Sequence, residues 1–334
     1  MARKPVKPLG ELALIEMIRA RAGRSARVRL GIGDDCAAVR VPAGHEVLVT
    51  TDFSLENRHF RRDWHSARAI GHRVLARGLS DLAAMGAEPV AAFLSLAVAK
   101  DVVKSNFIVE FLDGMLELAQ KFVVPLAGGD TSESPGGEVL ADIVLLGSAP
   151  TGKALLRSGA RAGDLLYCTG KLGGAAAELT ELAKSPKKFR TARADGDHPH
   201  LFPVPRIAAG LALRKRRLAT ACMDLSDGLS SDLAHLCEAS GVAAEVDAAR
   251  VPIHPLAAKL GAEAALDAAL HGGEDYELLF AAKPGTKMPR SIGGVTVTCI
   301  GRLVARKKSG SLMTLVEQDG SRQELVRGGW EHLQ

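Results

Sequence analysis

The sequence Glu-Val-Leu-Val-Thr-Thr-Asp at residues 46–52 runs from apolar side chains directly into hydroxyl and carboxylate side chains. Its valines and leucine have the β-branched and apolar character of a buried strand. The pattern predicts a strand that ends in Thr50, Thr51 and Asp52, whose hydroxyl, carbonyl and carboxylate oxygens would point toward one place. A strand end whose polar residues only cap the next element explains the same pattern. This segment alone therefore leaves a functional and a structural interpretation open.

Helices and strands alternate on either side of this strand. Apolar residues at helical spacing predict helices over residues 66–85 and 104–122, and Asp81 would lie near the end of the first helix. Short apolar runs predict strands over residues 123–127 and 138–147. Such an alternation indicates a mixed α/β domain.

A break in composition at residues 149–152, Ala-Pro-Thr-Gly, predicts a domain boundary, with one α/β domain over residues 1–149 and a second over residues 150–334. A chain of 334 residues is long enough for two domains that each bury a core. The second half repeats the alternation of the first. The expected strands are 164–169, 277–282 and 295–302; the expected helices are an Ala-rich one after Gly174 and those at 206–217, 229–240 and 256–270; a hairpin is expected over 312–326 with its turn at Asp319-Gly320.

Residues 185–205 are rich in Pro, Lys, Arg, Asp and His, which predicts an exposed loop or lid. His198 and His200 within it have the spacing of a metal-binding pair. No third ligand lies nearby in the sequence, so a polar surface loop is the favoured interpretation.

Acidic residues stand beside glycine or serine in several stretches of otherwise apolar sequence. Burying a carboxylate is costly unless a positive group meets it, so these stretches together predict a converging cation site. Oxygen ligands without Cys or His at metal spacing favour magnesium over zinc, and aspartate-bound magnesium commonly binds substrate phosphates, which points to nucleotide chemistry. The stretches are Gly31-Ile-Gly-Asp-Asp35, Thr50-Thr-Asp52, Leu79-Ser-Asp81, Gly128-Gly-Asp-Thr131, Asp224-Leu-Ser-Asp-Gly228 and Gly272-Gly-Glu-Asp275.

These stretches differ in how strongly they indicate function. Residues 224–228 place two acids at an expected helix start, and capping by Asp227 leaves Asp224 without a structural role. The acids at 274–277 are likewise concentrated before a strand, and function is favoured for both. Residues 128–130 after a strand suit a phosphate approached by backbone amides, but ordinary turns have the same sequence.

Composition excludes several classes of partner. A net charge of +5 and an aromatic content of 4% offer no stacking platform for nucleic acid. The longest apolar run, residues 90–99, is too short to span a bilayer. The five cysteines are scattered without metal or redox spacing, and Glu11 and Glu16 interrupt the N-terminal apolar stretch as no signal peptide would allow. We expect a cytoplasmic protein without nucleic-acid or membrane partners.

Taken in order, these motifs resemble the thiamine-monophosphate kinase family, in the superfamily that includes aminoimidazole ribonucleotide synthetase. The resemblance runs from Gly10-Glu11 to Gly329-Trp330-Glu-His332, so it covers nearly the whole chain. It implies ATP-dependent phosphorylation of thiamine phosphate to thiamine diphosphate by direct transfer, with several Mg²⁺ ions. It also implies a two-domain α/β fold and a homodimer whose N-terminal domains pair their sheets into a β-barrel.

The resemblance also assigns roles to individual residues. Asp130 and Asp227 would act on the reaction through metal. The implied magnesium ligands are Asp35, Thr50, Thr51, Asp52, Asp81, Asp130, Asp224 and Asp227; Gly129, Asp130, Arg157 and Ser226 would meet ATP; His59, Glu274 and Trp330 would meet thiamine phosphate.

Other functions remain open at this stage. Within the superfamily, the chain could be a purine-pathway synthetase or a selenide-activating enzyme, although the latter uses a reactive Cys near its N-terminus and no Cys precedes Cys36 here. Outside enzymes, it could be a nucleotide-binding regulator that catalyses nothing. The intact acidic motifs argue against a regulator, because a site that no longer binds metal tends to lose its costly acids.

Overall fold

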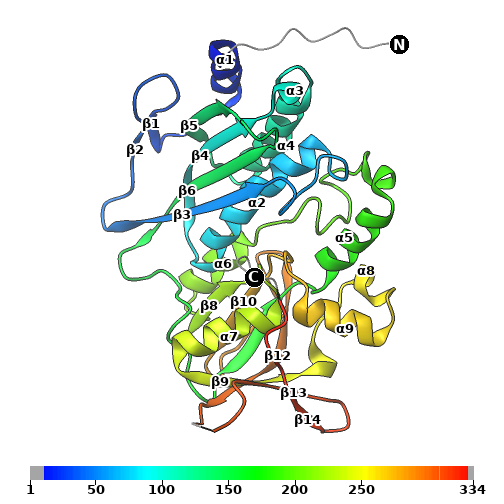
Figure 1. Ribbon diagram of the computed structural model, residues 1–334. Coiled ribbons are helices and arrows are strands. Elements are labelled where there is room, and N and C mark those ends of the chain that lie inside the picture. The colour runs from blue at the N-terminus through cyan, green and yellow to red at the C-terminus, as the bar shows by residue number, and fades with distance from the viewer. Residues whose placement is uncertain (1–10, 308, 330–334) are drawn as a thin grey trace. The chain divides into compact units, whose positions relative to one another are not determined.

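The computed structural model describes residues 11–307 and 309–329, and the chain divides into two compact units (Figure 1). Unit 1 comprises Met1–Leu79, Pro89–Thr151 and Ser185–Gly196. Unit 2 comprises Ser80–Glu88, Gly152–Lys184 and Asp197–Gln334. Both units are mixed α/β structures.

Unit 1 is built on an open four-stranded sheet in the order β3-β6-β4-β5. β3 and β6 are antiparallel along their whole length, and β4 and β5 are parallel. The strands are β3 (His45–Leu55), β6 (Leu140–Pro150), β4 (Glu88–Val98) and β5 (Leu126–Glu133). The sequence analysis assigned no strand to the run that became β4, because an unbroken apolar run lacks the period of two that marks a half-buried strand.

Helices α2 (Ala67–Ala84) and α4 (Phe107–Lys121) cover one face of this sheet (Figure 1). A Cβ atom on Gly71 would overlap the backbone of α4, and one on Gly114 would overlap the backbone of α2, so glycine permits this close helix packing. A Cβ on Gly78 would lie 2.8 Å from Leu145 of β6, which places α2 directly on the sheet. Both predicted helices are confirmed, although a separate turn, α3 (Lys100–Val103), precedes α4.

The opposite face of β3 is open. Val47, Val49 and Phe53 are 48%, 60% and 60% exposed, and they alternate with residues that face the helices. The prediction that β3 ends at Asp52 is wrong: the strand continues to Leu55, since its pairing with β6 persists over its full length. The sheet has β3 and β5 as its edges, and the described part of the chain contains no closed barrel.

β5 also differs from the sequence prediction. The expected strand over residues 123–127 lies further along, so that Gly128, Gly129 and Asp130 are inside a strand and not in a turn after one. Gly129 has a φ of +149°, and a Cβ there would overlap the carbonyl oxygen of Leu94 on β4. Glycine is needed here because the two strands approach each other so closely.

The remaining elements of unit 1 border β5. These are α1 (Glu11–Arg21) and the small hairpin of β1 (Val28–Leu30) and β2 (Ala38–Val39). Side chains of the hairpin, including Val28 and Val39, pack against Ala127 of β5. The acidic stretch at residues 31–35 therefore lies in the loop beside that strand.

Unit 2 contains an eight-stranded sheet in the order β14-β13-β9-β12-β7-β10-β8, with β11 paired to β12. All its pairings are antiparallel except that of β9 with β13. The strands are β7 (Leu165–Thr169), β8 (Ala221–Asp224), β9 (Val242–Asp247), β10 (Leu278–Ala282), β11 (Ser291–Ile292), β12 (Val295–Ala305), β13 (Met313–Val316) and β14 (Arg322–Glu324). The predicted hairpin is confirmed as β13 and β14.

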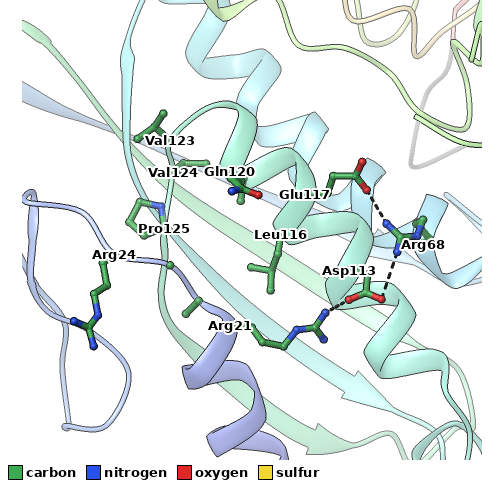
Figure 2. A pocket seen from close by; sticks show the side chains of 13 residues that line it. Arg21, Arg24, Arg68, Asp113, Leu116, Glu117, Gln120, Val123, Val124 and Pro125 are labelled. Atoms are coloured by element: carbon green, nitrogen blue, oxygen red, sulfur yellow. Dashed lines mark hydrogen bonds and ion pairs between the residues drawn. The ribbon is translucent and has the colours of Figure 1, made fainter. Parts of the chain in front are cut away.

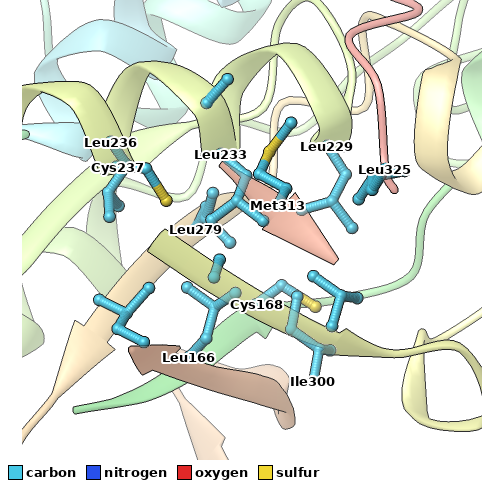
Figure 3. Close-up of a cluster of buried hydrophobic side chains, with 14 of the residues drawn as sticks. Leu166, Cys168, Leu229, Leu233, Leu236, Cys237, Leu279, Ile300, Met313 and Leu325 are labelled. Atoms are coloured by element: carbon cyan, nitrogen blue, oxygen red, sulfur yellow. The ribbon is translucent and has the colours of Figure 1, made fainter. Parts of the chain in front are cut away.

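The core of unit 2 lies between α7 and this sheet (Figure 3). Leu229, Leu233 and Leu236 of α7 belong to one buried cluster with Leu279 and Met313 of the sheet. The helices are α5 (Gly174–Lys184), α6 (Ile207–Lys215), α7 (Leu229–Ser240), α8 (Pro255–Ala258) and α9 (Ala262–His271), with short 3₁₀ turns η1 (Pro186–Phe189) and η2 (Ala248–Arg250).

Two predictions for unit 2 need correction. The helix predicted over residues 256–270 is split into α8 and α9 at Gly261, whose φ of +95° is incompatible with a continuous helix. The stretch predicted as an exposed loop over residues 185–205 has a buried end, since His200, Leu201 and Phe202 are buried. Of the helices that the structure describes, none combines the length and apolar character needed to cross a membrane.

Candidate functional site

An open cavity of about 630 Å³ in unit 1 gathers several of the predicted site residues. Asp34, Asp35, Gly129 and Asp130 all line it. The Asp34 carboxylate accepts a hydrogen bond from the backbone N–H of Asp35 at 2.9 Å, and the Asp130 carboxylate accepts one from Thr131 at 2.9 Å. The three aspartates are exposed, so a hydrated cation can reach their carboxylates from solvent.

β5 forms one wall of this acid-lined cavity as an edge strand. Edge strands present backbone N–H and C=O groups along their outer side, and glycine lets a ligand approach that backbone closely. On the other wall, a Cβ on Gly33 would lie 3.2 Å from the guanidinium carbon of Arg19. Arg19 of α1 therefore leans over the acidic loop, a placement that the sequence did not reveal because α1 carries no motif.

Asp52 lies apart from this cavity. Its carboxylate accepts two hydrogen bonds from Arg77 of α2, at 3.0 and 2.7 Å, on the helix-covered face of the sheet. Asp130 pairs in register with Ser95 of β4. Both residues lie on the face of the sheet opposite to the helices, and Asp130 is on the edge strand farthest from β3. Unit 1 by itself therefore does not bring Asp52 to Asp130.

The two threonines before Asp52 point in opposite directions. Thr50 shares the helix-covered face with Asp52, whereas the Thr51 hydroxyl lies on the open face and donates to Asp142 at 3.3 Å. Their side chains cannot converge on one point, because alternate strand residues face opposite sides. Only the backbone carbonyl groups and one hydroxyl could join Asp52 as ligands.

His59 lies in the turn that follows β3. Its Nδ1 accepts a hydrogen bond from the backbone N–H of Leu55 at 3.0 Å, so the ring proton of the neutral form is on Nε2. The ring lines a small pocket together with Arg73 and Arg77. His59 is therefore next to the arginine that binds Asp52.

The second group of predicted residues lies in unit 2, around Asp224 at the end of β8. Asp224 is 3% exposed, and the Ser80 hydroxyl donates to its carboxylate at 2.7 Å. Burial raises the pKa of Asp224 above the ordinary carboxyl value, and the charge of Arg157 acts in the opposite direction. Ser80 immediately precedes Asp81, so the motif at the end of α2 meets the motif at the end of β8.

Asp232 is a site residue that the sequence analysis missed. It is 1% exposed in the first turn of α7, and its carboxylate accepts the backbone N–H groups of Ser226 at 3.0 Å and Asp227 at 3.1 Å. Burial raises the pKa of Asp232 well above its usual range, and the charges of Asp224 and Asp227 raise it further. An acid in the first turn of a predicted helix, shortly after two others, was the available signal.

These three neighbouring acids in unit 2, Asp224, Asp227 and Asp232, are called the buried acid cluster below. Negative charge accumulated under apolar side chains is what a hard cation would neutralise, so the oxygen donors present fit magnesium chemically. Among residues 11–307 and 309–329, however, no three His, Cys, Asp or Glu side chains already form a metal-binding group.

The motif at residues 272–277 is joined to the buried acid cluster by backbone hydrogen bonds. The N–H of Glu274 donates to the backbone carbonyl oxygen of Ser226 at 2.7 Å, and the N–H of Tyr276 donates to that of Leu225 at 2.9 Å. Glu274 has a φ of +68°, a left-handed conformation that side chains other than glycine rarely adopt. This strained turn fixes Glu274 beside Ser226 and Asp227.

The C-terminal stretch also reaches this region. The N–H of Gly329 donates to the Ser231 hydroxyl at 3.2 Å, and a Cβ on Gly329 would overlap the Asp227 carbonyl oxygen. Trp330, which the resemblance assigns to thiamine phosphate, lies outside the described residues.

The backbone N–H groups of the glycine loop before α5 bind a carboxylate of the same chain. Asp275 accepts hydrogen bonds from the backbone N–H groups of Gly173 at 2.7 Å and Ala175 at 3.2 Å. Burial raises the pKa of Asp275 from an ordinary value of 3.8 to about 7. Its carboxyl group therefore caps the start of α5.

A second hollow in unit 1, of about 720 Å³, lies between the end of α1 and α4 (Figure 2). Arg68 pairs with Asp113 at 3.4 Å and with Glu117 at 2.6 Å, and Arg21 also pairs with Asp113. Figure 2 shows these side chains together beside Leu116. Since Arg21 and Arg68 pair with acids and none of the predicted site residues lines it, this hollow is not the candidate site.

Comparison with known proteins places both halves of the chain. Residues 33–149 match the family described as AIR synthase related protein, N-terminal domain, and residues 161–316 match the corresponding C-terminal domain. The chain is 40% identical over 307 residues to thiamine-monophosphate kinase of Escherichia coli K12, covering 89% of this chain and 91% of that protein.

Two solved structures are also similar. Thiamine-monophosphate kinase from Stenotrophomonas maltophilia K279a is 35% identical with a TM-score of 0.80, covering 95% of this chain and 98% of that one. AaThiL complexed with AMPPCP and TMP is 29% identical with a TM-score of 0.74, covering 100% of this chain and 99% of that one.

Proposed function

We propose, because this chain belongs to the thiamine-monophosphate kinase family of AIR synthase related proteins, that it phosphorylates thiamine phosphate to thiamine diphosphate with ATP. The observation that carries the proposal is the 40% identity to a thiamine-monophosphate kinase across 89% of the chain. A related structure was obtained with AMPPCP, an ATP analogue, and TMP, which agrees with these two substrates.

The reaction joins two anions. A phosphate oxygen of thiamine phosphate forms a bond to the γ-phosphorus of ATP while the bond from that phosphorus to the β–γ bridging oxygen breaks, giving thiamine diphosphate and ADP. Alignment and charge neutralisation dominate such a transfer, so the protein needs no covalent nucleophile. Residues that hold cations and phosphates are therefore the important ones.

Acidic residues of the chain would hold magnesium. When bound, Mg²⁺ supplies positive charge that reduces repulsion between the phosphates. Asp232 holds the backbone of Ser226 and Asp227, and Ser80 orients Asp224, so these ligands are preset by hydrogen bonds. The proposed ligands are Asp35, Thr50, Thr51, Asp52, Asp81, Asp130, Asp224 and Asp227.

Other residues would bind the two substrates. Gly129 offers edge-strand backbone to ATP, Ser226 offers its hydroxyl, and Arg157 can pair bidentately with a phosphate. Glu274 would attract the cationic thiazolium ring of thiamine phosphate, with His59 at the same substrate. For Trp330, the proposal that it stacks on that ring rests on the sequence alone.

Product analysis tests this function directly. The full chain is incubated with ATP, Mg²⁺ and thiamine phosphate, and the mixture is separated by chromatography. We expect thiamine diphosphate and ADP in equal amounts, and neither product when Mg²⁺ is removed with a chelator. ADP formation without thiamine diphosphate, or activity on thiamine phosphate unaffected by the chelator, would overturn the proposal.

The protein would act as a homodimer. Val47, Val49 and Phe53 form an exposed apolar row on the long edge strand β3, and such rows on edge strands favour pairing with another sheet. Pairing of two unit 1 sheets would close the barrel that the family resemblance implies. Replacing Val49 and Phe53 by Lys should shift sedimentation from dimer to monomer, and a wild type that sediments only as monomer at micromolar concentration would exclude this assembly.

The cytoplasm would be its location. The structure leaves all five cysteines unpaired with one another, which is usual for proteins of a reducing compartment. Fractionation of cells that express the full chain would check this placement.

A further inference from the structure

The segment 197–206 contradicts the expectation of a polar surface loop. His200 is buried, as are the following Leu201 and Phe202. The histidine side chain is 2% exposed, which is uncommon for a group able to carry charge. A histidine buried to this extent needs a structural or functional reason.

Glu178 of α5 fixes the first part of this segment. Its buried carboxylate accepts hydrogen bonds from Nδ1 of His198 at 2.6 Å and from the backbone N–H groups of His200 at 2.8 Å and Leu201 at 3.2 Å. A buried carboxylate with several donors is well satisfied and holds its donors in place. The backbone at His200 is thus fixed by a helix.

The side chain of His200 reaches the turn that carries Glu274. Its Nδ1 lies 3.1 Å from Oε2 of Glu274, whose side chain is 24% exposed. The Glu274 backbone is held separately through Ser226, in the left-handed conformation described above. Two independent contacts therefore set the position of Glu274, one to its backbone and one to its carboxylate.

The end of the segment binds the same turn. Arg206 donates from Nε and Nη2 to the carboxylate of Glu277, at 2.8 and 2.5 Å, and the Thr169 hydroxyl donates to it at 2.6 Å. Glu277 is buried and saturated with donors, so it has a structural task. Glu274, by contrast, keeps part of its surface accessible to a ligand.

We propose that His200 is a positioning residue for thiamine phosphate: it holds one oxygen of the Glu274 carboxylate so that the other oxygen is presented to the cationic ring system of the substrate. This inference rests on the proposed function. A carboxylate held in its bound orientation loses less side-chain freedom when the substrate arrives, which strengthens binding. The proposed function assigns Glu274 to thiamine phosphate and not to ATP, so we expect the affinity for ATP to depend little on His200.

Steady-state kinetics of His200→Leu and His200→Asn test the proposal. Leucine keeps the bulk and removes the donor, whereas the asparagine amide can place an N–H near the original Nδ1. We expect His200→Leu to raise KM for thiamine phosphate about tenfold and to change KM for ATP less than about twofold, while His200→Asn restores most of the loss. His235→Leu is the matched control, since His235 faces Glu238 at 4.0 Å on the surface of α7 and should change neither constant.

A double-mutant cycle identifies the partner of His200. Once Glu274→Gln is present, His200→Leu should raise KM for thiamine phosphate little further, because both substitutions remove the same interaction. Fully multiplicative effects, equal damage to both KM values, or no rescue by asparagine would overturn the proposal. If His200→Leu does not fold, His200→Asn is compared with His200→Asp. The aspartate adds a negative charge beside the Glu274 carboxylate, so His200→Asp should have the higher KM for thiamine phosphate.

The two proposals fail in different ways. A wild type that makes no thiamine diphosphate would overturn the proposed function together with this inference. An active wild type whose KM for thiamine phosphate is the same in His200→Leu would overturn this inference alone.

Discussion

The acid-lined cavity of unit 1 and the buried acid cluster of unit 2 present carboxylates in opposite surroundings. Asp34, Asp35 and Asp130 are exposed, and the carboxylates of Asp34 and Asp130 each accept a hydrogen bond from the backbone N–H of the next residue. Asp224 and Asp232 are almost fully buried and are bound by Ser80, Ser226 and Asp227. The pKa values of Asp224 and Asp232 are raised because burial disfavours the charge of their carboxylates.

This difference separates two ways of preparing a cation site. Exposed acids attract a hydrated cation but are held loosely, so binding itself must order them. Buried acids are already ordered by hydrogen bonds, and the cost of their charge is recovered only when a cation arrives. Substitution of an acidic ligand in either region should therefore lower turnover, and the stability of each variant shows whether that acid also supports the fold.

The largest effect should come from removing one negative ligand in each region. Asp130→Asn and Asp227→Asn keep nearly the same volume, so we expect turnover to fall by more than about 100-fold, beyond the loss seen when only outer partners of a metal are disturbed. Circular dichroism and melting temperature should stay close to those of the wild type. Lost tertiary structure in both variants, with normal activity per folded molecule, would show that these acids are structural.

A backbone substitution should separate packing from charge in the cavity wall. Gly129→Ala puts a Cβ against the Leu94 carbonyl at a positive φ, and we expect it to lower the free energy of unfolding by at least about 2 kcal/mol. Gly44→Ala is the control, because Gly44 also has a positive φ but has no neighbour within 4 Å of the added Cβ. Urea unfolding should show a clearly smaller loss for the control, and equal losses would contradict the close approach of β4 and β5.

Asp232→Asn should reveal how far the buried cluster is preset. The amide keeps an acceptor for the loop and removes a buried charge, so we expect stability to change by no more than about 1 kcal/mol. Turnover should fall about 10- to 100-fold, since the two hydrogen bonds that hold the loop carrying Asp227 lose their charged acceptor. Asp319→Asn, in the exposed β13–β14 turn, should leave turnover unchanged. Normal turnover in Asp232→Asn would show that Asp227 is positioned without it.

The stability of the protein should also depend on pH. Folding raises the pKa of Asp275 to about 7, so between about pH 4 and pH 7 the folded protein binds more protons than the unfolded chain. Its contribution to the free energy of unfolding is present below this window and is lost as the pH rises through it, by at most about 1.4 kcal/mol per pH unit. Without Mg²⁺, Asp275→Asn should therefore cost more stability at about pH 5 than at about pH 7. Urea unfolding that shows the reverse order would contradict the burial of this carboxyl.

The sequence was most informative where one physical rule acts locally. Helical spacing of apolar residues predicted α2, α4 and α7 with nearly correct ends, and the Asp319-Gly320 turn predicted the hairpin of β13 and β14. The family followed from motifs whose order and spacing match it. The central strand β4 was missed because an unbroken apolar run has no period.

Features that depend on distant partners could not be derived from the sequence. Gly129 reads as a turn residue until Leu94 of the neighbouring strand is known to press against it. Nothing in the polar segment around His200 indicates that Glu178 of α5 binds its backbone. The opposite faces of Thr51 and Asp52, by contrast, already follow from the alternation of side chains within the predicted strand.

The most direct test follows the transferred phosphoryl group itself. The full chain is given ATP labelled in its γ-phosphate, with thiamine phosphate and Mg²⁺, beside Asp130→Asn and Asp227→Asn as one variant from each acidic region. We predict that the wild type moves the label into thiamine diphosphate, one label for each ADP formed, with none retained on the protein and almost none transferred by either variant. Label that stays in ATP, appears as free phosphate, or reaches thiamine diphosphate equally in the variants would contradict it.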